Sequence, residues 1–188
     1  MSVSIDVKSL HRTFKDMPKI KQIVFGSILS SLATIFHIAG GAVPIIGYFL
    51  SPLATAPIIF CTIFSKSLGL AAYTVTIISL FILMPSELII FPFTTGLLGL
   101  GIGLALHFIE RRINIIVCGA FFLSMGILIL LYGIHFPVLG PGISQTFHFQ
   151  TVVLIFLFSI FYSWIWVVIS LASLRRLEVY LGKVSLAN

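Results

Sequence analysis

Charged residues are scarce in this chain. Only 9% of its 188 residues are Asp, Glu, Lys or Arg, whereas 59% are hydrophobic. A water-soluble fold needs far more polar surface than this, so the composition excludes a soluble globular protein. No charged residue occurs in the runs 22–65, 67–86, 88–109 and 113–174. Apolar runs of this length indicate helices that cross a lipid bilayer.

Acidic residues, cysteines and common catalytic motifs are also few or missing. The chain has no H-E-x-x-H, G-x-S-x-G or Walker A sequence, and its five acids form no cluster suited to Mg²⁺. His107 and Glu110 lie three residues apart, but two ligands are too few for a metal site. Cys61 and Cys118 fall in apolar stretches, so no disulfide framework is indicated. We therefore expect no enzyme, no metal site and no cofactor.

The apolar runs divide into six predicted helices. The first run contains Gly40-Gly41-Ala42-Val43-Pro44, and the fourth contains the polar, Gly/Pro-rich stretch 137–145. Glycine pairs and prolines interrupt helices, so each of these two runs is expected to hold two helices. The predicted spans are 20–40, 49–65, 67–84, 86–109, 113–134 and 150–174.

The Lys and Arg residues stand at the ends of these spans, which indicates membrane topology and not nucleic-acid binding. With the N-terminus in the cytoplasm, all 11 of them fall on the inner side and the three outer loops contain none. This agrees with the preference of Lys and Arg for cytoplasmic loops. We expect an all-α, polytopic, six-helix bundle in the cell membrane, with residues 1–188 forming one domain and both termini cytoplasmic.

The segment before the first helix, residues 1–19, has the pattern of a basic amphipathic helix. Its apolar residues recur every three or four positions, with most of its lysines and its arginine off that stripe. We expect it to lie on the inner leaflet of the membrane lipid. Docking to a cytoplasmic partner is the alternative. The stripe consists of Val3, Val7, Leu10, Phe14 and Met17.

Glu87 is the one acid far from any basic residue. It follows Pro85-Ser86 at the predicted outer end of the fourth span. An ionisable group at a membrane boundary needs a partner, water or a cationic ligand, which makes Glu87 a candidate binding residue. The alternative is a solvated carboxylate favoured in the first turn of its helix by the helix dipole.

Other polar and aromatic residues are expected at the same membrane face, where they would line an outward-facing pocket for a small molecule. Aromatic rings there would stack on a planar ligand, and His or Gln would fix it by hydrogen bonds. The competing interpretation is the ordinary enrichment of aromatic residues at membrane boundaries. The candidates are His37, Tyr48, His135, Gln145 and His148, with Tyr162, Trp164 and Trp166 of the sixth span.

Small residues recur at four-residue spacing in two spans. Gly99 and Gly103 do so in the fourth span, and Ser27 and Ser31 in the first. This spacing lets helix backbones approach closely. We expect it to serve packing within the bundle, and contact with another protein is the alternative.

The layout resembles the substrate-binding S-components of energy-coupling factor (ECF) transporters, which are small, basic, six-helix membrane proteins. The local similarity lies in Pro44–Gly47, Ser51–Pro57 and Ser67–Ala71, and in the glycine-rich fourth span that ends in Glu110-Arg111-Arg112. The resemblance covers residues 20 to 176.

The resemblance implies an outward-facing pocket for a vitamin or other micronutrient, formed by the outer halves of the last three spans and by the outer loops. It also implies partners: a transmembrane coupling subunit, docked on small residues of the first span, and ATPase subunits. Here the docking register holds Ser27, Ser31 and nearby Ala33 where the family often has alanines. Metal-transporting members carry a histidine at position two, whereas this chain has Ser2, which disfavours a metal substrate.

Two other classes of function remain open. An accessory or structural subunit of another membrane complex would have no small-molecule substrate, and its outer polar residues would face water. A free-standing transporter is disfavoured, because ion-coupled carriers usually keep buried acids for their coupling ion and often contain internal repeats.

Overall fold

The computed structural model describes residues 11–12, 14–43, 46–136 and 148–186, and these residues are helical almost throughout and contain no strand. The expected all-α class is confirmed. Five helical segments are long and apolar enough to cross a membrane. They are α2 (Lys19–Ala42), α5 (Lys66–Leu83), the run Pro85–Phe108, the run Arg112–Gly133, and Phe149–Arg176 of the last helix.

The second predicted span is built from shorter pieces and is not one of these five. It comprises α3 (Ile46–Leu50), the 3-10 turn η1 (Ser51–Ala54) and α4 (Thr55–Phe64). Pro52 in the 3-10 turn has no N–H to donate, which favours the tight turn over a continuous α-helix. The apolar helix Ser51–Phe64 is about 21 Å long at 1.5 Å per residue. It is shorter than the hydrocarbon layer.

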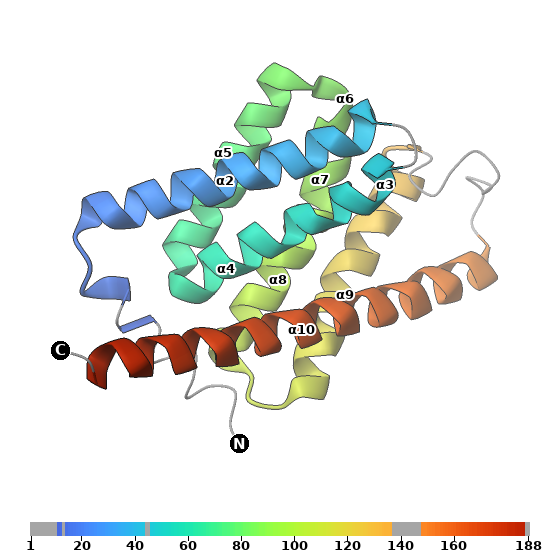
Figure 1. The fold of residues 1–188 in the computed structure, drawn as a ribbon. Coiled ribbons are helices and arrows are strands. Elements are labelled where there is room, and N and C mark those ends of the chain that lie inside the picture. Colours follow the sequence, from blue (N-terminus) through green and yellow to red (C-terminus); the bar gives the residue numbers. More distant parts are fainter. Residues whose placement is uncertain (1–10, 13, 44–45, 137–147, 187–188) are drawn as a thin grey trace.

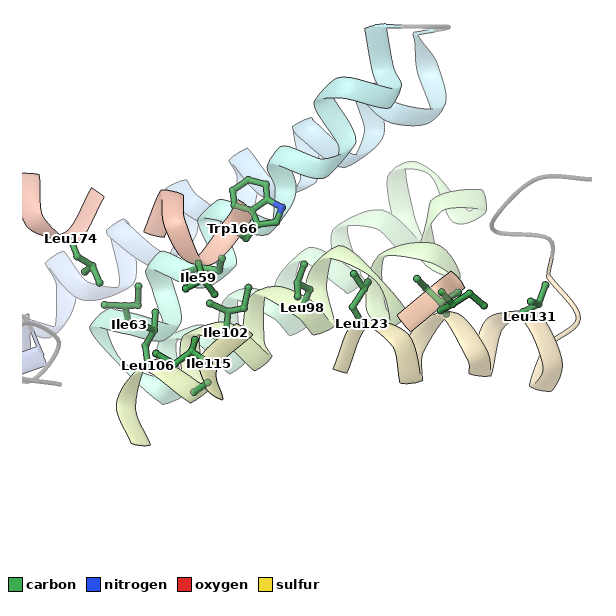
Figure 2. Packing of buried hydrophobic residues seen from close by; sticks show 14 residues of the cluster. Ile59, Ile63, Leu98, Ile102, Leu106, Ile115, Leu123, Leu131, Trp166 and Leu174 are labelled. Atoms are coloured by element: carbon green, nitrogen blue, oxygen red, sulfur yellow. The ribbon is translucent and has the colours of Figure 1, made fainter. Parts of the chain in front are cut away.

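Helix α4 lies at the centre of the molecule, which accounts for its uniformly apolar sequence. Seven of its 10 residues are buried. Ile59 and Ile63 pack into a core with α8, α9 and α10 (Figure 2). Ile58 and Cys61 pack into a second core with α2, α5 and α7, whose arrangement around α4 is seen in Figure 1. A helix that is apolar on every side is stable only when it is surrounded. Here its neighbours are other helices of the chain.

Glycines on α8 (Thr95–Phe108) let this helix lie against α4. A Cβ on Gly99 would come within 2.9 Å of the Ile58 Cβ, and a Cβ on Gly103 would overlap Thr62. The small-residue spacing predicted in the fourth span therefore serves packing inside the chain, as expected.

The fourth predicted span is broken at Thr94. It is divided into α6 (Pro85–Leu88), α7 (Ile90–Phe93) and α8, and Ile89 between α6 and α7 keeps helical dihedrals (φ −73°, ψ −35°). Pro92 cannot donate a backbone hydrogen bond, and Thr94 leaves helical geometry with φ −119° and ψ −99°. The hydroxyls of Thr94 and Tyr73 donate to the carbonyls of Ile90 and Pro92, at 2.8 and 3.0 Å. The side chains of Thr94 and Tyr73 thus donate hydrogen bonds to backbone carbonyls next to the broken part of the helix.

The last two spans are α9 (Arg112–Leu128), which ends in a π-helical turn, η2 (Ile129–Gly133), and α10 (Phe149–Leu186). Helix α10 has 38 residues and is therefore about 57 Å long. This exceeds the roughly 30 Å hydrocarbon layer, so its last turns extend beyond the part suited to lipid.

The helix ends and turns that carry the described Lys and Arg residues gather at one end of the bundle, termed here the basic end (Figure 1). At this end α2 begins, α4 is followed by α5, α8 is followed by α9, and Leu174 of α10 packs with Ile63 and Leu106. The Lys66 Nζ lies 3.9 Å from the centre of the Phe108 ring, which joins two of these turns. The residues with described side chains are Arg12, Lys15, Lys19, Lys21, Lys66, Arg111, Arg112, Arg175 and Arg176.

The N-terminal amphipathic segment lies largely outside the described residues. Its described part folds against the basic end. Phe14 is buried between Phe25 and Phe64, with ring centres 5.6 and 5.1 Å away. His11 Nδ1 donates to the Phe64 carbonyl at 2.7 Å, and His107 Nε2 donates to the Thr62 carbonyl at 2.7 Å. The two histidines thus satisfy carbonyls at the C-terminal end of α4, which a helix leaves without partners.

Candidate functional site

A partly open cavity of about 360 Å³ lies toward the end of the bundle opposite the basic end. It is formed by residues from the end of α2, the turn η1, the broken segment α6 to α8, the last turns of α9 and the first half of α10. Figure 1 shows where these elements lie. This volume falls in the range of small-molecule sites. Its wall consists of Gly40, Ser51, Pro52, Glu87, Ile90, Thr94, Thr95, Leu123, Ile127, Phe158 and Tyr162.

Most of this wall is apolar, and one side of it is aromatic. Phe158 and Tyr162 stand one helical turn apart on α10, with ring centres 5.7 Å apart and ring planes inclined by 24°. Leu123 and Ile127 of α9 are also four residues apart and give a neighbouring aliphatic surface. Such a wall can hold the apolar body of a ligand, against which a few polar groups set its orientation.

Glu87 brings a carboxylate to this apolar wall, and His37 lies behind it. The carboxylate Oε2 is 3.3 Å from His37 Nε2, which is ion-pair distance but lacks hydrogen-bond alignment. The Glu87 side chain is 14% exposed, whereas His37 is fully buried. On its other side His37 Nδ1 lies 3.1 Å from the Ser51 hydroxyl.

The tautomer of His37 depends on the direction of its hydrogen bond with Ser51. If the Ser51 hydroxyl donates to Nδ1, the proton of the neutral ring is on Nε2 and faces the carboxylate of Glu87. Ser51, His37 and Glu87 then form a relay in which each ring nitrogen of His37 faces a complementary group. In this form the relay places no cationic charge beside the carboxylate.

Two glycines allow the relay to assemble. A Cβ on Gly40 would lie 2.6 Å from the Ser51 Cβ, and a Cβ on Gly41 would lie 2.5 Å from Glu87 Oε1. This glycine pair is predicted from the sequence to end the helix. In the structure, α2 continues through both residues to Ala42, and their missing side chains make room for Ser51 and Glu87.

Within the part of the chain that the structure describes, the cavity wall contains no Lys or Arg. In the sequence, no Lys or Arg occurs in residues 22–65, 67–110 or 113–174. Among the described residues, the carboxylate of Glu87 therefore has no permanently cationic side chain on the cavity wall to neutralise it.

The wall also holds a buried hydroxyl whose hydrogen-bond capacity is unused among the described residues. Thr95 is 8% exposed, and its Oγ1 has no partner there. It directly follows the break at Thr94, so the start of α8 faces the cavity. Buried hydroxyls nearly always have a partner, which a ligand or water in the cavity would supply.

Ser51, His37 and Glu87 occur in the order of a hydrolase relay, but the residue after Ser51 lacks a donor that such chemistry commonly uses. A nucleophilic serine commonly uses a neighbouring backbone N–H to stabilise the oxyanion. The residue after Ser51 is Pro52, whose nitrogen carries no hydrogen and cannot supply this donor.

Of the residues predicted to bind substrate, the structure brings His37 and Glu87 together. Tyr162, one of the three aromatic candidates of the sixth span, lines the cavity beside them. Trp164 is 47% exposed and stacks on Phe161, outside the cavity wall. Trp166 is 4% exposed and packs in the core, as Figure 2 shows.

The remaining candidates are not brought to the cavity wall by the described structure. His135 and His148 are exposed, and His135 has a φ of 58°. Gln145 lies outside the described residues, as does the side chain of Tyr48, whose backbone belongs to α3.

The three residues predicted to dock a partner do not share one environment. Ser27 and Ser31 are exposed on α2, whereas Ala33 is fully buried in the core with α4 and α5. The exposed face of α2 thus contains the two serines and not the alanine. Among the residues described, no group of three His, Cys, Asp or Glu side chains could hold a metal ion.

The sequence interpretation missed Ser51, Thr94, Thr95 and Phe158. For Phe158 a signal existed, because it stands four residues before Tyr162 and therefore on the same helix face. The other three are ordinary small polar residues at helix breaks. Only the arrangement of the helices shows that they line the same cavity as Glu87.

Comparison of the chain with protein-family models, with curated proteins and with solved structures finds no match.

Proposed function

We propose that this chain is a six-pass membrane protein that binds a small micronutrient, such as a vitamin, from outside the cell. It presents the substrate for uptake to a partner complex made of a transmembrane coupling subunit and ATPase subunits. The chain's own task is selective capture. The partner ATPase subunits supply the energy for transport.

The distribution of charge supports a six-pass topology with cytoplasmic termini. In addition to the five long apolar segments, the pieces from Ile46 to Phe64 together span 19 residues, or about 29 Å as helix. This suffices for a sixth crossing of a layer about 30 Å thick. With the basic end in the cytoplasm, all 11 Lys and Arg residues of the sequence obey the positive-inside preference.

The observation that carries the proposal is the cavity beside Glu87. It is large enough for a small organic molecule and is built from segments that are far apart in the sequence. In this topology it opens toward the outside of the cell. A broken helix beside the cavity, here at Thr94, is typical of substrate sites within membranes.

The exposed part of α2 supports a docking role for the first span. Ser27 and Ser31 give this face small side chains in the middle of the helix. The larger exposed side chains around them, those of Val24, Ile28 and Ile35, are apolar. Small residues allow a partner helix to approach closely within a bilayer. We expect the coupling subunit to pack there.

Native mass spectrometry of the protein, purified in mild detergent from its own host, tests this function. We expect a retained small molecule in the wild type and its loss in Glu87→Gln. Trp164→Ala is the matched control, because Trp164 lies outside the cavity and should leave retention unchanged. ATPase and coupling subunits should copurify with all three proteins.

A different outcome would favour the accessory-subunit alternative. In that case the purified protein would carry no metabolite and no ATPase, and a different membrane protein would copurify in fixed stoichiometry.

A further inference from the structure

Glu87 provides the strongest indication of what the cavity binds. It is the one acid in the sequence between residues 17 and 109, and it lies at the wall of an otherwise uncharged cavity. Bringing a carboxylate to an apolar wall is costly unless a positive charge or several hydrogen bonds compensate it. No Lys or Arg of the described cavity wall does so.

His37 does not remove this requirement in the tautomer described above. The Ser51 hydroxyl occupies Nδ1, and Nε2 faces the carboxylate at 3.3 Å without hydrogen-bond alignment. The neutral imidazole thus leaves the charge of the carboxylate in place. The side chain's 14% exposure keeps part of the carboxylate open to the cavity.

The aromatic side of the cavity has the same electrostatic preference. The faces of aromatic rings carry partial negative charge and attract cations, most strongly where water is excluded. Phe158 and Tyr162 offer two such rings on the wall that also holds Glu87. Leu123 and Ile127 beside them favour an apolar body. A carboxylate and aromatic faces together are suited to an organic cation.

We propose that the cavity binds a small organic cation with an apolar or aromatic body, whose positive group meets Glu87 and whose body lies along Phe158 and Tyr162. This inference rests on the proposed binding function and specifies its substrate class. A hydrogen-bond acceptor on the ligand would also use the free hydroxyl of Thr95.

A series of three probes of similar size but different charge tests this proposal. The probes are benzylammonium, benzyl alcohol and benzoate, which are cationic, neutral and anionic at pH 7. Each is titrated by ligand-observed NMR into the full-length protein in nanodiscs of zwitterionic lipid, with empty nanodiscs subtracted. We expect saturable binding of benzylammonium at least about tenfold tighter than that of benzyl alcohol, and no binding of benzoate.

Variants then assign the preference to its source. In Glu87→Gln, the affinities for benzylammonium and benzyl alcohol should become about equal. Glu110→Gln is the matched control, because Glu110 is exposed near the basic end and its loss should preserve the preference. Tyr162→Leu should weaken binding of the cation about twofold to thirtyfold. Should Glu87→Gln fail to fold, this second variant still tests the proposal.

Three results would overturn the proposal: equal affinity for the cation and the alcohol, a preference for benzoate, or no saturable binding of any probe. Equal affinity would mean that His37 already neutralises Glu87. These results are distinguishable from failure of the proposed function, because a retained neutral or anionic metabolite in the mass spectrum would preserve the binding function and exclude the cation.

Discussion

Replacing Gly126 with alanine tests the contact on which one wall of the cavity depends. Gly126 of α9 lies against the backbone of Phe93, directly before the break at Thr94. A Cβ at this position would overlap the Phe93 carbonyl oxygen and come within 2.7 Å of the carbonyl carbon. Ordinary carbon contacts are about 3.5 Å or longer, so the backbone would have to retreat by roughly 0.8 Å for the carbonyl carbon alone, and by more for the overlapping oxygen.

The matched control is Gly133→Ala on the same segment. There the nearest atom to an added Cβ is Ile129 Cγ2 at 3.8 Å, an ordinary contact. Replacing glycine with alanine in a helix stabilises it by about 1 kcal/mol at most sites. Overpacking against a backbone atom, which cannot rotate away, costs about 3 kcal/mol. The difference between the two variants therefore isolates the strain at Gly126.

The assay is thermal unfolding in detergent, followed by tryptophan fluorescence at one fixed heating rate. For a chain of this size about 1 kcal/mol corresponds to roughly 2 to 4 °C in Tm. We expect Gly126→Ala to unfold about 6 to 12 °C below Gly133→Ala. Equal Tm values would refute the close contact between α9 and Phe93, and with it the described wall of the cavity.

Two further stability predictions concern the core and the end of α4. Leu98 is fully buried, whereas Leu157 is 56% exposed. In detergent unfolding, Leu98→Ala should therefore lower the free energy of unfolding by about 2 to 5 kcal/mol, and Leu157→Ala by less than about 1 kcal/mol. Similar losses in the two variants would contradict the described core. His107→Ala should destabilise by about 1 to 3 kcal/mol, because the Thr62 carbonyl loses its donor. His107→Gln, which keeps an N–H donor, should recover part of this loss, and a Gln variant no better than Ala would argue against the hydrogen bond.

The sequence allowed the helices to be predicted better than their interruptions. Uncharged runs and breakers located the five long apolar segments, because lipid requires about 20 apolar residues per crossing. The 3-10 turn at Ser51 and the break at Thr94 were missed. Pro52 and Pro92 were visible in the sequence, but a proline kinks, ends or begins a helix according to what its neighbours can satisfy.

Within the candidate site, Glu87 was predictable because a lone charge far from any partner stands out in an apolar sequence. The orientation of α10 was not. Trp164 and Tyr162 are two residues apart, so they point to different sides of the helix, and the sequence holds nothing that says which side faces α9. The structure places Tyr162 at the cavity and exposes Trp164.

The central claim is that the cavity faces the outside of the cell while the basic end faces the cytoplasm, and cysteine labelling tests it most directly. Ser86 and Ser67 are both exposed, one beside Glu87 and the other beside Lys66, and each is changed to cysteine in a chain whose Cys61 and Cys118 are alanine. A membrane-impermeant maleimide is applied to intact cells and then to disrupted cells. We predict that Ser86→Cys reacts in intact cells and Ser67→Cys only after disruption. The reverse pattern, or equal labelling of both in intact cells, would contradict the claim.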